Sequence, residues 1–169
     1  NNGNRNILMD PLVTGLVVGQ TLHTTAGEIY RALIEATAFG ALTIIKRIEE
    51  YAVEVKEVVN CGGIAEKSPL VMQIYADVCN RPMKISRAPQ TCALGAAILG
   101  TVAAGQANGG YDTPQDAAAR MARLKDEAYA PDPSAHQAYT TLYQEYTQLH
   151  DYFGRGANDV MKRLRKMRG

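Results

Sequence analysis

The stretch VVNCGGIAEKSP, residues 58–69, most constrains the fold, because its backbone must change from one regular geometry to another over a short distance. The preceding residues VEVKEVVN alternate and are rich in valine, which is typical of a strand that ends at Asn60. The Ser-Pro pair at 68–69 supplies a helix N-cap and the one helical position that tolerates proline. Gly62 and Gly63 lie in between. The sequence therefore predicts a strand, a glycine turn and a helix in succession.

Helical patterns flank this segment on both sides. Apolar residues at steps of three and four predict a long helix from about 25 to 51, and the helix after the Ser-Pro pair should run to about Cys79. Residues 82–86 are expected to form a second short strand. A helix over 91–104, dominated by alanine and glycine, should end at Gly105. This alternation of helices and strands predicts an α/β domain with a small sheet.

The C-terminal third contains two more helix starts and a basic end. Thr113-Pro114 and Asp132-Pro133 each supply a cap followed by proline. The second of these helices carries one stripe, formed by Ala135, Tyr139, Leu142, Tyr146, Leu149 and Phe153. After Gly154 the aromatic anchors stop, so residues 154–169 are expected to be a weakly ordered tail that does not drive function. A solvated terminal segment explains its positive charge better than nucleic-acid binding does.

Composition narrows the class of protein. With 169 residues, 46% hydrophobic and 21% charged, the chain resembles one ordinary globular domain, and a net charge of +1 gives no strong attraction to nucleic acid or membrane. No apolar run has the roughly 20 residues of a membrane helix, and the first residues lack the basic n-region followed by an apolar h-region that is typical of a signal peptide. Cys61, Cys79 and Cys92 are expected to be reduced core thiols, which favours the cytoplasm. The absence of an initial methionine indicates a fragment of a longer protein.

Several kinds of catalytic or metal site find no support. His136 and His150, if on one helix, lie about 21 Å apart at 1.5 Å per residue, so they cannot share an ion. No Walker pattern is present, which excludes phosphoryl transfer by a P-loop. Carboxylates such as Asp77 and Asp112 are expected in helix or turn contexts, and nothing in the sequence marks them as a catalytic pair.

Four segments together carry a family resemblance: NGNRNI, RALIEATAFG, CGGIAEKSPLVMQIYADVCNRPM and TCALGAAILG. In this order they resemble the C-terminal portion of the FGGY family of carbohydrate kinases, over roughly residues 1–153. GQTL and YRALIEATAFG are most similar to the members that phosphorylate L-ribulose. The resemblance implies an actin-like, ribonuclease H-like α/β fold. Residues 1–24 would be a loop-rich connection from an upstream region, and 25–153 a portion of the nucleotide-binding domain.

The resemblance also assigns a role to the glycine turn. On its own, such a pair is better explained by a tight turn that needs glycine only for a positive φ. In the family this turn holds the adenosine part of ATP, so Gly62 and Gly63 would line adenine and ribose. Lys67 would lie near the base, with Ala65 and Ser68 completing the wall.

A further family segment has two explanations of equal weight. Ala93, Leu94, Gly95 and Ala96 match a helix beneath the nucleotide cleft. The small residues of this segment are explained equally by close packing and by the approach of a ligand.

Two more matches have structural alternatives. Arg31 and Glu35 match charged residues of the family's long helix, but with Glu28 they also form the spacing of an ordinary ion-pair ladder, which is the favoured interpretation. Asn4 and Arg5 match a loop near the interdomain cleft. That arginine could touch phosphate or simply tie loops together, and the residues do not decide between the two.

Three functions remain. The leading one is the nucleotide-side part of a kinase that transfers the γ-phosphate of ATP to a ketopentose, with L-ribulose favoured, giving L-ribulose 5-phosphate for arabinose catabolism. The family's catalytic aspartate, phosphate loop and sugar pocket lie upstream, so no catalytic residue is expected here and the fragment should be inactive alone. Mg²⁺ would be held mainly by the phosphates and upstream residues.

The same family also acts on other sugars such as xylulose. The alternatives are a stand-alone ATP-binding or regulatory module, and an interaction domain whose tail recruits nucleic acid. The expected partners are ATP and a sugar, with neither membrane nor nucleic acid, and a homodimer through the aromatic stripe is left open.

Overall fold

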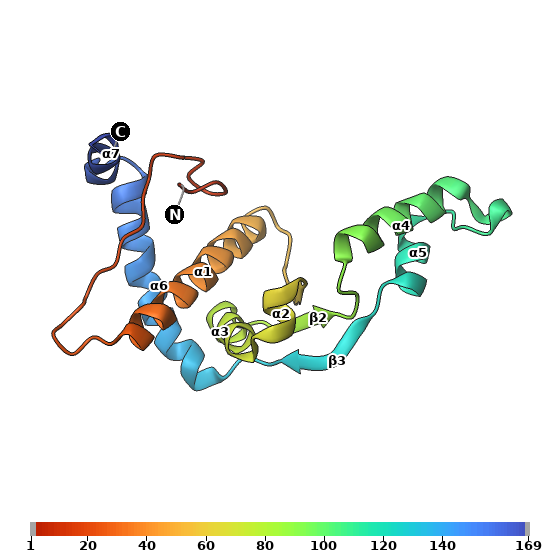
Figure 1. Cartoon of the computed structure of the whole chain (residues 1–169), viewed down its shortest axis with the longest axis horizontal. Coiled ribbons are helices and arrows are strands. Elements are labelled where there is room, and N and C mark those ends of the chain that lie inside the picture. The colour runs from red at the N-terminus through yellow and green to blue at the C-terminus, as the bar shows by residue number, and fades with distance from the viewer. Residues whose placement is uncertain (1–2, 168–169) are drawn as a thin grey trace. The chain divides into compact units, whose positions relative to one another are not determined.

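The chain divides into two compact units. The computed structural model describes residues 3–167. The helical unit comprises the residues up to Val55, Asp77–Cys79 and the residues from Asp132 onward, and the sheet unit comprises Lys56–Ala76 and Asn80–Pro131. Figure 1 shows the elements of both units along the chain.

The sheet unit is built on three strands in the order β1-β2-β3. Strand β1 (Val58–Asn60) runs parallel to β2 (Met83–Ser86), and β3 (Leu124–Tyr129) pairs antiparallel to β2 on its other side. Helices α2 (Gly63–Lys67) and α3 (Pro69–Cys79) lie between β1 and β2 in the sequence. The two predicted strands are confirmed, each somewhat shorter than expected, whereas β3 was not predicted.

Local capping and a small core explain this arrangement. The Oγ of Ser68 accepts a hydrogen bond from the N–H of Val71 at 3.4 Å and so caps α3, as the Ser-Pro pair predicts. The central strand β2 is the most buried of the three. Its Ile85 packs with Ala65 of α2 and Met72 of α3, and these contacts bury the connection against the sheet.

Two further helices follow β2 in the sheet unit. Helix α4 (Thr91–Ala104) ends at Gly105, whose φ of 73° confirms the predicted glycine stop. The short helix η1 (Gln106–Asn108) leads to α5 (Pro114–Met121), which begins at the predicted cap Thr113. The backbone N–H of Tyr111 donates to the carbonyl of Thr101 at 3.1 Å, which ties the connecting loop back to α4. No residue of α4 is buried.

The helical unit consists of α1 (Ala26–Glu49), α6 (Pro133–Gly154) and α7 (Val160–Lys166). Thr25 and Glu28 form a capping box at the start of α1, and Asp132 caps α6 through hydrogen bonds at 2.7 and 3.0 Å. The ring of Phe39 on α1 contacts three tyrosines of α6, and its centroid lies 5.4 Å from that of Tyr146. Tyr139 and Tyr146 of the predicted stripe thus pack on α1 together with Tyr143. Leu142 and Leu149 of the stripe are exposed, so the prediction holds for only part of it.

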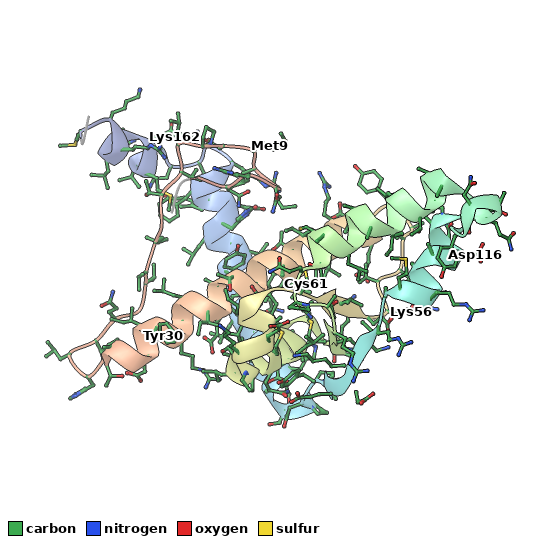
Figure 2. All side chains as sticks on the ribbon, turned by 45° about the vertical axis from the view of Figure 1, so that its right-hand side comes forward. Met9, Tyr30, Lys56, Cys61, Asp116 and Lys162 are labelled. Atoms are coloured by element: carbon green, nitrogen blue, oxygen red, sulfur yellow. The ribbon has the colours of Figure 1, made fainter. Side chains whose placement is uncertain are left out.

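The basic end of the chain contains a helix that the sequence did not predict. Helix α7 lies within residues 154–169, and Lys162 forms an ion pair with Asp10 of the N-terminal loop at 2.8 Å. Figure 2 shows Lys162 and Met9 of that loop in the same corner of the molecule. Weak order of the tail stays a prediction. Within residues 3–167, no helix combines the length and apolar composition that crossing a bilayer requires.

Candidate functional site

The two glycines after β1 have different structural roles. Gly62 is the N-cap of α2 and has φ 89° and ψ 171°, a conformation that essentially only glycine adopts without strain. Gly63 opens α2 without a positive φ, and a Cβ built on it would meet no described atom within 4 Å. The turn therefore requires glycine at position 62. At position 63 the described chain leaves open space that a side chain could fill.

Several residues close to Gly63 along the chain have exposed side chains. Cys61, labelled in Figure 2, is exposed, and so is Cys92, so the expectation of core thiols was wrong for both and holds only for Cys79. Lys67 at the end of α2 is also exposed. Ile64 follows Gly63 directly and is 69% exposed. An exposed isoleucine beside an open glycine offers an apolar surface to a flat ring. The sequence analysis did not single out Ile64, although its place directly after the glycine pair was a usable signal.

The other two predicted site residues are used by the fold itself. Ala65 is 5% exposed and lies in the core with Met72 and Ile85. Ser68 is half-buried, and its hydroxyl caps α3. Of the five residues expected to line adenosine, the structure thus places Gly62, Gly63 and Lys67 at or near the surface of the turn, and Ala65 and Ser68 in supporting positions.

The small residues of α4 are not explained by packing within the described chain. A Cβ built at Gly95 or Gly100 would meet no described atom within 4 Å. Ala93 and Ala96 are exposed, and Leu94 is half-buried. Within the described residues of the sheet unit, close packing is therefore not the reason for glycine at these two positions.

Arg31 and Glu35 belong to a network between α1 and α6. The Nε of Arg31 lies 2.8 Å from a carboxylate oxygen of Glu35, and its Nη2 donates to the hydroxyl of Tyr139 at 3.0 Å. The Tyr139 hydroxyl in turn donates to Glu35 at 2.8 Å. Tyr139 is 5% exposed, and its burial, followed by this hydrogen bond, raises its pKa. The three residues thus stabilise the contact of two helices. Glu28 does not extend the ladder, since its carboxylate accepts from the N–H of Thr25.

The N-terminal loop is closed by Asn4. Its side-chain oxygen accepts from the N–H groups of Ile7 and Leu8 at 3.2 and 3.1 Å, and its backbone pairs with Asp10 at 2.9 Å in both directions. Arg5, on the same loop, is exposed. Asn4 therefore ties the loop together, whereas Arg5 faces solvent in the described structure.

The histidines make separate contacts. Nδ1 of His136 lies 2.8 Å from the carbonyl oxygen of Asp77, and Nδ1 of His150 lies 2.9 Å from the carboxylate of Asp151. Within the part of the chain that the structure describes, no three His, Cys, Asp or Glu side chains gather as metal ligands would.

Comparison with known proteins identifies the family. The model of the C-terminal domain of the FGGY family of carbohydrate kinases matches residues 1–104. The chain is 53% identical over 167 residues to a ribulokinase of Halalkalibacterium halodurans, covering 99% of the chain and 30% of that protein. It is 46% identical to a ribulokinase of Mycolicibacterium smegmatis, covering 99% of the chain and 29% of that protein. The chain thus spans about 30% of the length of these curated relatives.

Solved structures give the same result for the fold. A ligand-bound xylulose kinase of Lactobacillus acidophilus superimposes with a TM-score of 0.80 at 23% identity, covering 92% of the chain and 30% of that structure. A xylulose kinase of Rhodospirillum rubrum gives a TM-score of 0.70 at 27% identity, covering 84% of the chain and 28% of that structure. The predicted actin-like α/β fold is confirmed. The chain belongs to the FGGY family of carbohydrate kinases, and its residues 1–104 match the family's C-terminal domain.

Proposed function

We propose that the full-length protein containing this chain is an ATP-dependent kinase that phosphorylates a ketopentose, and that its substrate is L-ribulose. Two relatives of the chain named ribulokinase, from different genera, support this choice at 53% and 46% identity. The product would be L-ribulose 5-phosphate, as in arabinose catabolism.

Within that enzyme, we assign the turn at Gly62 and Gly63 to the adenosine part of ATP. The observation that carries this assignment is the open space at Gly63, because the fold itself does not require glycine there. A side chain at this position would occupy the space that a ring could enter. Exposed Ile64 offers an apolar contact for the base, and Lys67 a positive charge near it. Ala65 and Ser68 act indirectly, since they hold α2 and α3 in place.

The chain's contribution is binding, not bond making. Phosphoryl transfer needs a base for the attacking hydroxyl and cations that neutralise the transferring phosphate. We assign Mg²⁺ mainly to the phosphates and to residues outside this chain, as the family resemblance implies. The catalytic base is assigned to the same outside region.

The test is an assay of the full-length protein with ATP and Mg²⁺ against L-ribulose, D-xylulose and glycerol. We expect the highest kcat/KM for L-ribulose. Equal or higher kcat/KM for another sugar would refute the substrate, and no activity on any sugar would refute the kinase.

A stand-alone ATP-binding or regulatory module is the second candidate, because the turn assigned to adenosine lies wholly in the sheet unit. Calorimetry with ATP would distinguish the two. A module binds ATP tightly as the isolated chain, whereas the kinase proposal expects tight binding only in the full-length protein.

A further inference from the structure

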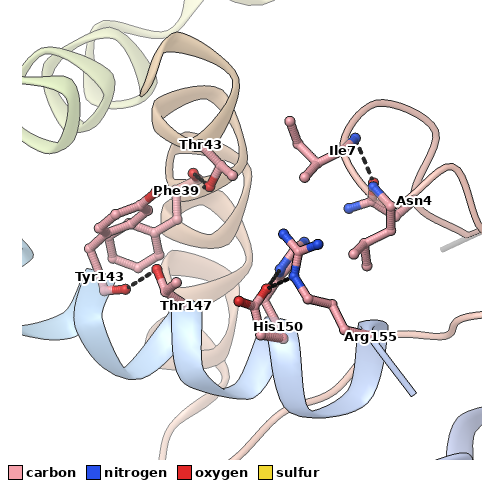
Figure 3. A network of polar contacts seen from close by, with 10 residues as sticks. Asn4, Ile7, Phe39, Thr43, Tyr143, Thr147, His150 and Arg155 are labelled. Atoms are coloured by element: carbon pink, nitrogen blue, oxygen red, sulfur yellow. Dashed lines mark hydrogen bonds and ion pairs between the residues drawn. The ribbon is translucent and has the colours of Figure 1, made fainter. Parts of the chain in front are cut away.

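The helical unit contains a small cavity apart from the residues of the glycine turn. Its volume is about 240 Å³, and its walls come from the C-terminal half of α1, the C-terminal half of α6 and the N-terminal loop. Figure 3 shows the neighbourhood, with Thr43 on α1, His150 on α6 and Ile7 on the loop. Pockets for drug-sized ligands usually begin at about 300 Å³, so this one suits a smaller molecule or a single chemical group.

Packed aromatic rings support one side of the cavity. Tyr146 contacts Phe39 with ring centroids 5.4 Å apart and stacks on His150 at 5.8 Å. The hydroxyls of Thr43 and Tyr143 lie 3.2 Å apart. Burial raises the pKa of Tyr146, so its hydroxyl stays neutral at physiological pH and adds no negative charge.

The lining carries an excess of positive charge. Three permanent cations, Lys46, Arg47 and Arg155, face two carboxylates, Glu50 and Asp151. Each carboxylate already pairs with an arginine, Glu50 with Arg47 and Asp151 with Arg155. The remaining cation is therefore Lys46.

Two of these cations have donors to spare. The ammonium group of Lys46 lies 4.4 Å from the centroid of the Tyr143 ring, a contact that leaves its N–H groups able to bind an anion. Arg155 uses its Nε on Asp151 at 2.9 Å. In Figure 3 the end of its guanidinium points from α6 toward the loop that carries Ile7. Arginine in this situation can present two parallel N–H groups to one phosphate or carboxylate.

The loop that forms the third wall is held from several sides. Asn4 closes it internally, and Leu8 packs against Gly154, where a Cβ would collide with the leucine side chain. Lys162 of α7 adds the ion pair with Asp10 at 2.8 Å. A wall fixed in this way lowers the ordering cost that a ligand would otherwise meet on binding.

We propose that this cavity binds the phosphate group of a small anion, with Lys46 and Arg155 as its principal contacts. The site lies wholly in the helical unit, whereas the turn assigned to adenosine lies in the sheet unit, so the proposal adds a second anion site to the protein. The size of the cavity selects a small ligand, and the charge surplus with two available donors selects an anion.

The experiment is calorimetric titration of the full-length protein with inorganic phosphate at constant ionic strength, with chloride as the balancing anion. A saturating non-hydrolysable ATP analogue keeps the nucleotide site occupied. We expect phosphate to bind, and Lys46→Gln and Arg155→Gln each to raise its Kd at least fivefold. The matched variants Lys166→Gln and Arg163→Gln, at exposed positions of α7, should leave the Kd within twofold.

Two further titrations identify the source of the phosphate and test whether a loss of binding is due to misfolding. Binding of a pentose 5-phosphate that is tighter than that of inorganic phosphate, and that Lys46→Gln and Arg155→Gln weaken, would support the site with a sugar phosphate as its ligand. Equal affinity would support it with the phosphate group alone recognised, and tighter binding that neither variant weakens would be assigned to the active site and count against the cavity. Lys46→Arg keeps the charge and should retain binding, which separates loss of the contact from loss of the fold. No heat beyond that of chloride, or equal Kd values in Lys46→Gln, Arg155→Gln and the α7 variants, would overturn the proposal. Because binding is measured without turnover, this outcome is distinct from failure of the kinase assay.

Discussion

Replacing Gly63 with valine in the full-length protein should raise the KM for ATP while leaving the fold intact. Gly63 has no positive φ, and a Cβ there meets no described atom within 4 Å. In helices, glycine costs about 1 kcal/mol and valine about 0.6 kcal/mol relative to alanine, so the substitution should change the free energy of unfolding by less than about 0.5 kcal/mol. The fold offers no reason for valine to be harmful at this position.

The expected loss is therefore in nucleotide binding. If the base occupies the open space, the valine side chain should cost about 1 to 2 kcal/mol of binding free energy, which corresponds to a roughly 5- to 30-fold higher KM for ATP. The turn would contact the part of ATP remote from the reacting phosphorus. Its contacts should then be similar in ground and transition states, so kcat and the KM for the sugar should stay nearly constant.

Gly62→Ala is the matched control. Gly62 has φ 89° and ψ 171°, so alanine there should be strained by about 1 to 3 kcal/mol and should lower the melting temperature whether or not ATP binds nearby. The assay measures KM with ATP and sugar varied separately, together with a thermal melt of each variant. A Gly63→Val protein with wild-type melting temperature and wild-type KM for ATP would refute the adenosine assignment.

Two other substitutions and one truncation test separate parts of the structure. Tyr139→Phe removes a buried hydroxyl between Arg31 and Glu35 and should lower the free energy of unfolding by about 1 to 3 kcal/mol in urea titrations; an unchanged midpoint would contradict this. Hydrogen bonding, first from His150, lowers the folded pKa of Asp151 below its unfolded value of 3.8. The stability that Asp151 contributes should therefore be present above that value and lost as pH falls through the folded pKa, and an Asp151→Asn variant with the same acid unfolding profile would argue against it. Truncation after Phe153 should leave kcat/KM within about threefold but weaken phosphate binding, because it removes Arg155 as well as α7, which holds the loop beside the cavity; a hundredfold loss of kcat/KM would show a catalytic role of the tail.

Helix boundaries were predictable where the signal is local. Ser68, Thr113 and Asp132 each cap the helix that their sequence predicts, because a cap needs only a side-chain oxygen within a few residues of the free N–H groups. Strand β3 was missed because LKDEAY shows no alternation of apolar and polar residues. Its extended form depends on pairing with β2, and such pairing is not encoded within the segment itself.

In the candidate sites too, features set by neighbouring residues could be predicted, whereas features that depend on distant contacts could not. The need for glycine at position 62 follows from a local turn, and the sequence indicated it. That Ala65 packs in the core depends on Met72 and Ile85, which lie on other elements, so its distance from a ligand surface could not be deduced. The cavity of the helical unit was not predicted, because Lys46 and Arg155 come to line one cavity only once α1 and α6 have packed.

The pairing of α1 with α6 has a consequence during synthesis. Thr43 and Tyr143 touch across a sequence separation of 100 residues, and the whole sheet unit is encoded between them. At about 5 to 20 residues per second, a ribosome would release α6 roughly 5 to 20 seconds after α1. During that interval Phe39 and its neighbours lack their tyrosine partners, while the strands and helices encoded in between have already emerged. The nascent chain should therefore expose the apolar face of α1 to chaperones until α6 emerges, and an early stop codon before residue 133 should yield an aggregation-prone product.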